Sequence, residues 1–269
     1  YWQAEAFCDI MTNMKVISIT NQKGGVGKTT SAINIAYFIA KTGRRVLLLD
    51  FDPQGNATSG LGVDKNQLEN TMADVISGDI TLKDILMETG YKGLKLAPAT
   101  PVLANTEVEL ANTKGRFTRL KNAIETVEKD FDYVIIDSPP SLSLLTVNGF
   151  IASDYLILPV QAEFYAMEGL GQLLESMKLV KKGMNPDLNL LGVLPTMVDS
   201  RTTLSGQVYE EIKKFFPGKV FNTPIPRNIR LAEAPSHGVP VGVYDRFSKG
   251  ARAYKAVTKE IITRVEGEN

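Results

Sequence analysis

A glycine-rich stretch near the start of the chain carries residue types that bind phosphate. Asn21 to Thr30 reads NQKGGVGKTT, which follows a β-branched run over 16–20 and precedes a helical pattern over 29–41. Glycines at such a junction let backbone N–H groups curve around an anion, and the helix directs its positive N-terminus at the same point. In this loop Lys28 would contact the β- and γ-phosphates of a nucleotide, and Thr29 would offer its hydroxyl to Mg²⁺. The stretch predicts a nucleotide-binding loop rather than an exposed turn.

The loop departs from the usual P-loop pattern, G-x-x-x-x-G-K-[ST], at its first position. Gln22 stands where that pattern has glycine, and Lys23-Gly24-Gly25 follows, so a second lysine lies inside the loop. From the residues alone, Lys23 fits a solvated surface lysine as well as a phosphate contact. The order of strand, glycine loop and helix nevertheless matches a P-loop.

Three carboxylates stand at the ends of two other apolar runs. Asp50 and Asp52 belong to the segment DFDPQGN, and Asp137 opens the segment DSPPS. Ligands of an open α/β sheet bind beyond the carboxyl ends of its strands, so these acids are expected beside the phosphate loop. Only one acid of the Asp50–Asp52 pair is expected to face the phosphate easily. The alternative for both is an N-cap or turn role before Pro53.

Apolar strands that alternate with helical patterns would position these segments. Strands are predicted over 15–20, 45–50, 94–98, 133–137, 155–160, 190–196 and 219–221, and helices over 29–41, 116–129, 165–182, 204–215 and 251–265. Runs such as YVIID and YLILPV are apolar on both faces, as in a parallel sheet that is covered on both sides. The order predicts an α/β fold with a single doubly wound, mainly parallel sheet and helices on both faces.

Composition and charge narrow the class of protein. The 269 residues include 30 basic and 30 acidic side chains, which excludes a globally basic nucleic-acid binder but not a local basic patch. Cys8 is the only cysteine, so a disulfide framework and a cysteine-paired metal site within one chain are excluded. Residues 1–13 lack the pattern of a signal peptide, and we expect them to be an N-terminal extension or an expression remnant. A cytoplasmic location is expected.

Four segments together resemble one family. KGGVGKTT resembles the deviant Walker A box of the ParA/MinD family of P-loop ATPases, and LLLDFDPQGNAT resembles the second box and first switch of its ParA/Soj branch. DYVIIDSPPSLSLLT is similar to the Walker B strand and second switch, and TPIPRNIRLAEAPSHG resembles a further Soj-type segment. The resemblance covers about residues 14–263. It implies one P-loop ATPase domain over 14–266, followed by a tail at 267–269.

The resemblance implies a role for each residue of the site. ATP would lie on the loop residues Lys23, Gly24, Gly25, Val26, Gly27, Lys28, Thr29 and Thr30, with Met197, Pro226 and Asn228 near the adenine. Lys23 would reach the ATP of a second subunit, and Asp52 would orient the attacking water. Asp137 would hold Mg²⁺ through water, together with the loop threonine, since Mg²⁺ keeps several waters. The switch residues would be Asp50, Pro53, Ser138 and Pro139.

The resemblance also implies partners. An ATP-dependent homodimer of the ParA/Soj type would bind double-stranded DNA without sequence preference, associate with the nucleoid, and hydrolyse ATP faster with a ParB-type centromere-binding protein. It would segregate a chromosome or a plasmid. The C-terminal part is the more basic one, with 12 lysine and arginine residues against 7 acidic residues over 201–269. In Soj-like proteins, positions that match Arg201 and Arg230 contribute to DNA binding, and the nearby basic residues Arg227, Lys249 and Arg252 are further candidates. The alternative for this charge is an ordinary solvated helix face.

Two other functions remain open from the sequence. A MinD-like positioning ATPase would bind membrane through a C-terminal amphipathic helix, but we expect the apolar stripe of 251–265 to pack on its own sheet. An ATP-dependent biosynthetic P-loop enzyme would need a substrate pocket beside the γ-phosphate, and no motif for one is present.

Overall fold

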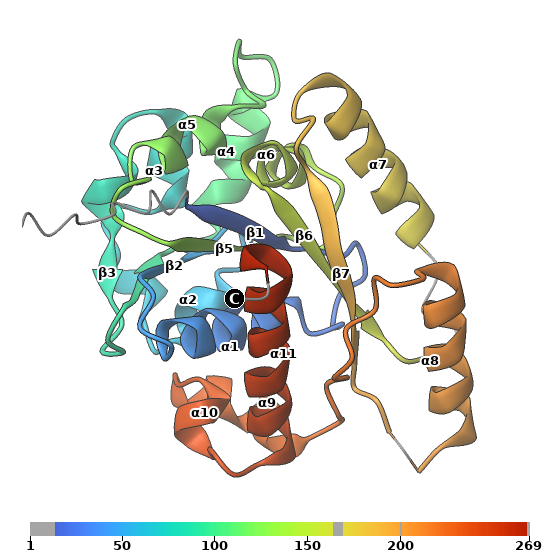
Figure 1. Cartoon of the computed structure of the whole chain (residues 1–269). Helices are drawn as coiled ribbons and strands as arrows, with labels where there is room; N and C mark the ends of the chain where they lie inside the picture. Colours follow the sequence, from blue (N-terminus) through green and yellow to red (C-terminus); the bar gives the residue numbers. More distant parts are fainter. Residues whose placement is uncertain (1–13, 164–168, 200, 268–269) are drawn as a thin grey trace, which may run out of the picture.

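The computed structural model describes residues 14–163, 169–199 and 201–267. These residues form a seven-stranded sheet with the strand order β3-β4-β2-β5-β1-β6-β7 (Figure 1). Its strands are β1 (Lys15–Ile19), β2 (Val46–Asp50), β3 (Met87–Glu88), β4 (Leu94–Ala97), β5 (Tyr133–Asp137), β6 (Tyr155–Gln161) and β7 (Asn189–Thr196). Only β3 pairs antiparallel, and every other neighbouring pair is parallel. The predicted mainly parallel sheet is confirmed.

Helices cover both faces of the sheet, as predicted. The helices are α1 (Lys28–Ala40), α2 (Asn56–Gly60), α3 (Met72–Ser77), α4 (Val102–Leu110), α5 (Arg119–Glu125), α6 (Leu144–Ala152), α7 (Leu170–Gly183), α8 (Thr203–Phe215), α9 (Ile229–Glu233), α10 (Val241–Tyr244) and α11 (Lys249–Glu266). One face packs against α1, α10 and α11. The other packs against α3 to α5 over one half of the sheet and against α6 to α8 over the other half.

The central strands are buried on both sides, which explains their unbroken apolar sequences. All five residues of β2, VLLLD, are buried, and so are all five residues of β5, YVIID. Leu48 joins the core under α1, whereas Leu47 and Leu49 join the core under α3 and α4. Because successive side chains of a strand point to opposite faces, each central strand contributes to two cores. Asp50 and Asp137, which end β2 and β5, are therefore buried together with their strands.

The last helix packs on the sheet, as its apolar stripe predicts. Tyr254, Val257 and Ile261 of α11 are at most 1% exposed and belong to the same core as α1. The side chain of Ser248 accepts a hydrogen bond from the amide of Ala251 at 3.1 Å and so caps the helix. The helices in the described residues include none that is long and apolar enough to span a bilayer.

Several predicted elements differ from the observed ones. The strand predicted over 219–221 is reduced to one bridge, between Val193 and Val220. The two-residue strand β3 was not predicted, because two residues show no periodicity. The helix predicted over 116–129 spans only Arg119–Glu125. Residues 165–168 of the helix predicted over 165–182 lie outside the described residues, and the described helix begins at Leu170.

Candidate functional site

The glycine loop lies between β1 and α1, at the carboxyl edge of the sheet. Gly25 and Gly27 have φ angles of 75° and 87°, in the left-handed region that L-residues with a side chain rarely adopt. Gly27 immediately precedes the first residue of α1, so the loop turns directly into the helix N-terminus. The loop thus presents backbone amides and the positive end of the helix together, which favours an anion.

Two side chains from outside the glycine run hold the loop in place. Asn21 donates its amide to the carbonyl of Pro159 on β6 at 2.7 Å, and its side-chain oxygen accepts from the backbone N–H of Lys23 at 3.0 Å. The hydroxyl of Thr196, at the end of β7, donates to the carbonyl of Val26 at 2.8 Å. The ends of β6 and β7 therefore fix the two halves of the loop. Sequence reasoning missed both contacts.

Lys28 lies at the centre of the site. The residue is 7% exposed, and its ammonium donates to the carbonyl of Lys23 at 3.2 Å. Burial lowers the pKa of Lys28, while the nearby carboxylates of Asp137 and Asp52 oppose this shift. The structure therefore places the P-loop lysine with two of the three predicted acids.

Asp137 is a buried carboxylate without a well-directed partner. It is fully buried at the end of β5, and neither of its oxygens makes a hydrogen bond with any described residue. Burial and the proximity of Asp50 raise the pKa of Asp137 well above its usual range, and the Thr29 hydroxyl opposes the shift without forming a well-directed bond. A buried carboxylate of this kind ionises only where a cation compensates its charge. Together with the Thr29 hydroxyl it offers the oxygen ligands that Mg²⁺ prefers.

Asp50 lies next to Asp137 on the neighbouring strand but, unlike Asp137, accepts hydrogen bonds from other described residues of the protein. The two residues are partners in the register of β2 and β5. Asp50 accepts hydrogen bonds from the amide and the hydroxyl of Thr58, both at 2.7 Å, and from the amide of Asp52 at 3.3 Å. Burial raises the pKa of Asp50 to about 7, although these hydrogen bonds lower it. Asp50 therefore fixes the segment that leads into α2.

Asp52 and its neighbours form a tight turn after β2. Asp52 is 5% exposed, and its side chain accepts from the amide of Gln54 at 2.9 Å. The carbonyl of Asp52 also accepts from the amide of Gly55 at 2.8 Å, across the half-buried Pro53. The turn role considered as an alternative for Asp52 is thus present, and it holds the carboxylate near Lys28.

The second predicted switch follows β5. Ser138 is 1% exposed, and its hydroxyl has no hydrogen-bond partner among the described residues. Pro139 is buried and Pro140 is exposed. The segment then leads into α6, where Leu145 donates its amide to the side chain of Glu107 on α4 at 3.0 Å. The Ser138 hydroxyl lies 3.7 Å from the position that a Cβ on Gly149 of α6 would occupy, so it faces α6.

Two segments bring together the residues predicted for the adenine. Met197 has a φ of 52°, which makes it the one described non-glycine residue in the left-handed region. Such backbone strain concentrates at functional sites. Val198 bridges to Pro226, and the amide of Arg227 donates to the carbonyl of Val198 at 3.1 Å. The side-chain oxygen of Asn228 is buried and has no partner among the described residues.

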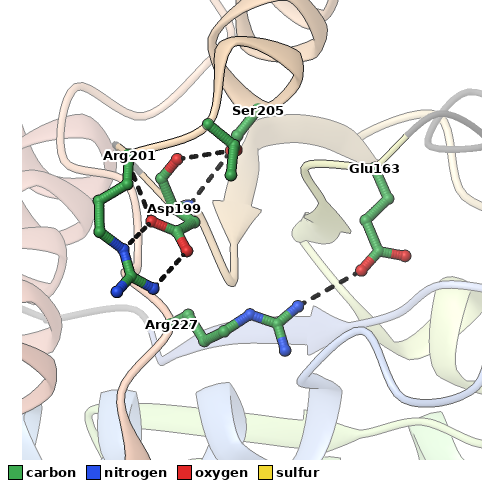
Figure 2. A network of polar contacts seen from close by, with 6 residues as sticks. Glu163, Asp199, Arg201, Ser205 and Arg227 are labelled. Carbon is green, nitrogen blue, oxygen red and sulfur yellow. Dashed lines mark hydrogen bonds and ion pairs between the residues drawn. The ribbon is translucent and has the colours of Figure 1, made fainter.

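The arginines predicted to bind DNA are paired with carboxylates. Arg201 contacts Asp199 at nitrogen–oxygen distances of 2.9 and 2.7 Å, and Arg227 contacts Glu163 at 3.4 Å. Both pairs are drawn in Figure 2. Arg230 contacts Glu233 at 2.7 Å and Asp245 at 3.5 Å. These pairs are exposed, so each is weak and open to exchange.

The two remaining predicted DNA contacts lie at the start of α11. Lys249 is exposed and forms no ion pair with a described residue. Arg252 donates to the carbonyl of Phe247 at 2.6 and 2.9 Å rather than to a carboxylate. The predicted DNA residues therefore do not form one free basic patch.

Known proteins resemble the chain over nearly its whole length. The family described as "AAA domain" matches residues 14–190. The sporulation initiation inhibitor protein Soj of Bacillus subtilis is 53% identical over 247 residues, which are 92% of this chain and 98% of that protein. The chromosome partitioning protein ParA of Myxococcus xanthus is 47% identical over 250 residues, which are 93% of this chain and 88% of that protein.

Among solved structures, a cobyrinic acid a,c-diamide synthase from Mycobacterium smegmatis with bound ADP and magnesium is similar to the chain. Its TM-score is 0.84 at 39% identity, covering 94% of this chain and 96% of that one.

Proposed function

The chain belongs to the Soj and ParA family of chromosome-partitioning ATPases and uses ATP with Mg²⁺, and we propose that it is a nucleotide-switched DNA binder. The observation that carries this function is the buried Lys28 between the left-handed glycine loop and the carboxylate of Asp137, which accepts no hydrogen bond from a described residue. That arrangement suits a nucleoside triphosphate bound together with a divalent cation, and few other classes of ligand would fit it.

Each residue around the phosphates has a distinct task. The loop amides and Lys28 bind the phosphates, and Thr29 with Asp137 holds Mg²⁺, which neutralises charge on the transferred phosphoryl group. Asp52 orients the attacking water, because its turn holds the carboxylate beside Lys28. Asp50 is a positioning residue, since its two hydrogen bonds with Thr58 fix the first switch.

Two subunits face each other through the glycine loops. A Cβ built on Gly24 would meet nothing within 4 Å in its own chain, so this side of the loop is open to a second subunit. Lys23 is half-buried beside this glycine and would reach the ATP of the second subunit. A cation from across the interface would stabilise the charge of phosphoryl transfer, as an arginine finger does.

The ATP-bound dimer binds double-stranded DNA through Arg201, Arg227, Arg230, Lys249 and Arg252. Phosphate contacts of this kind carry no sequence information and weaken steeply with salt. The exposed carboxylate pairs of the three arginines can exchange for phosphates, because each pair is weak. Dimerisation doubles the number of contacts. A ParB-type partner that stimulates hydrolysis would end the DNA-bound state on a chromosome or plasmid.

A biosynthetic enzyme is the second candidate. The observation in its favour is the similarity to the diamide synthase structure, at 39% identity. The relatives named Soj and ParA are more similar in sequence, at 53% and 47% identity. Membrane positioning is less favoured, because the apolar stripe of α11 lies in the core.

Sedimentation with nucleotide tests the proposal. Asp52→Ala, which should retain ATP, is expected to sediment as a dimer with ATP and as a monomer with ADP. Adding Lys23→Ala should weaken the dimer without removing bound nucleotide, and Lys182→Ala on α7 serves as a matched control. The proposed nucleotide switch would be contradicted if the protein sedimented as a dimer with both ATP and ADP, or as a monomer with both.

A further inference from the structure

A groove of about 1190 Å³ lies between the end of α1 and the outer side of α11. Figure 1 shows these two helices packed side by side. Arg246 and Phe247 line one part of the groove, and Arg44 with Glu266 lines another. Because α1 starts at the glycine loop and rises about 1.5 Å per residue, its far end is roughly 18 Å from that loop. The groove is therefore separate from the nucleotide site.

The groove has apolar lining along both helices. Half-buried Phe38 contributes aromatic surface from α1, and half-buried Ile262 contributes aliphatic surface from α11, while Tyr37 and Ala251 lie buried beneath them. Phe247 is 66% exposed at the same groove, although it is a large apolar side chain. The lining positions of α11 recur every three or four residues, so one side of the helix faces the groove along its length.

The same groove carries an excess of unpaired positive charge. Its lining includes five cations that form no ion pair with any carboxylate in the described part of the chain, and these are Lys41, Arg246, Arg252, Lys255 and Lys259. Only Arg44 of the lining is paired, with Glu266. This differs from Arg201, Arg227 and Arg230, each of which contacts a carboxylate.

We propose that the groove is a docking site for an acidic amphipathic helix of a partner protein. An apolar lining rimmed by cations is complementary to a helix with one apolar face and carboxylates along its borders. A DNA duplex presents a convex row of phosphates and offers no apolar side chains to Phe38, Phe247 and Ile262. The apolar lining therefore favours a peptide over a nucleic acid.

The dimensions suit a helix of about five turns. With 18 residues at about 1.5 Å each, α11 is roughly 27 Å long and lines the groove along that length. Two or three apolar anchors at i, i+3 or i+4, and i+7 of a partner helix would lie over Phe38 and Ile262. Its carboxylates would then reach Lys41 on one side and Lys255 and Lys259 on the other.

Docking here would also affect DNA binding, a consequence that rests on the proposed function. Arg252 lines the groove and is one of the predicted DNA contacts. An acidic helix in the groove would neutralise positive charge beside the DNA surface, so the peptide and DNA should weaken each other's binding. The docking itself needs neither ATP nor DNA and can be measured alone.

Fluorescence anisotropy with a designed probe tests the docking site. The probe is a labelled 18-residue helical peptide with leucines on one face and glutamates along its borders, and its control has glutamine at every glutamate position. The full chain should bind the acidic probe with a micromolar Kd and the glutamine probe at least about tenfold more weakly. Lys259→Glu should lower affinity for the acidic probe about tenfold, and Ile262→Ser should lower it as well. Lys182→Glu on α7 should leave it unchanged.

Two further readouts keep the proposal falsifiable. Lys259→Glu should keep wild-type ATP turnover and thermal stability, and it should gain affinity for a probe with lysine at the glutamate positions. The proposal is overturned if the acidic probe does not bind below millimolar concentration, or if Lys259→Glu and Lys182→Glu affect it equally. It is also overturned if Lys259→Glu instead lowers affinity for duplex DNA or for phosphatidylglycerol vesicles while peptide binding is absent.

Discussion

The nucleotide site and the arginine surface both depend on charge, but they hold their charges differently. Lys28, Asp50 and Asp137 are at most 7% exposed and are fixed by strand ends and a helix N-terminus. Arg201 and Arg230 are exposed and contact carboxylates that water also reaches. Buried charges interact strongly and are costly to leave unpaired, whereas exposed pairs are weak and screened by salt. A single substitution in the nucleotide site should thus abolish ATP binding or hydrolysis. A single substitution in the arginine surface should only reduce DNA binding.

Removing the buried cation should have the largest effect. Lys28→Ala leaves Asp137 without its nearby positive charge and removes a phosphate contact, so ATP affinity should fall about 1000-fold. Isothermal titration with ATP and Mg²⁺ measures this, with Lys182→Ala as the control. An affinity within a factor of three of wild type would remove Lys28 from the phosphate site.

Asp52 should affect turnover more than binding. Asp52→Ala should lower the rate of ATP hydrolysis about 100-fold, because the attacking water loses the group that orients it. ATP affinity should change little, since the loop amides and Lys28 remain. A phosphate-release assay compares this variant with Asp79→Ala, which changes an exposed acid. Unchanged turnover would leave Asp52 only its role in the turn.

The buried acids should make stability depend on pH. The pKa of Asp50 is raised by burial to about 7, so the folded chain holds a proton there that the unfolded chain releases near pH 4. This contribution to stability is present at low pH and is lost as pH rises through about 7. Without nucleotide, wild type should lose about 1.4 kcal/mol relative to Asp50→Asn between pH 6 and pH 8. Urea unfolding of both proteins measures the difference, and parallel pH profiles would contradict the raised pKa.

A surface arginine should give the smallest effect. Arg230→Glu should weaken binding of ATP-loaded protein to duplex DNA about fivefold at moderate salt, and it should flatten the dependence on salt. ATP-driven dimerisation should be unaffected. Lys129→Glu, an exposed reversal on another surface, is the matched control. Equal effects of the two reversals would mean that only total charge matters and that Arg230 lies outside the footprint.

The buried site was more predictable from the sequence than the surface. The glycine loop and the acids at strand ends are local patterns, and parallel strands bring their carboxyl ends to one edge. The contact of Asn21 with Pro159 spans 138 positions and that of Thr196 with Val26 spans 170, so neither follows from local pattern. The pairing of Arg227 with Glu163 likewise depends on how distant surface segments meet. The edge strand β3 was missed because it has only two residues.

Binding of Asp52→Ala to a random-sequence duplex tests the central claim most directly. The measurement compares ATP, ADP and no nucleotide across a series of salt concentrations. We predict binding only with ATP, with an affinity that falls steeply as salt rises, because several phosphates are contacted at once. Equal binding in all three nucleotide states, or no binding in any, would contradict a nucleotide-switched DNA binder and leave the ATPase with another task.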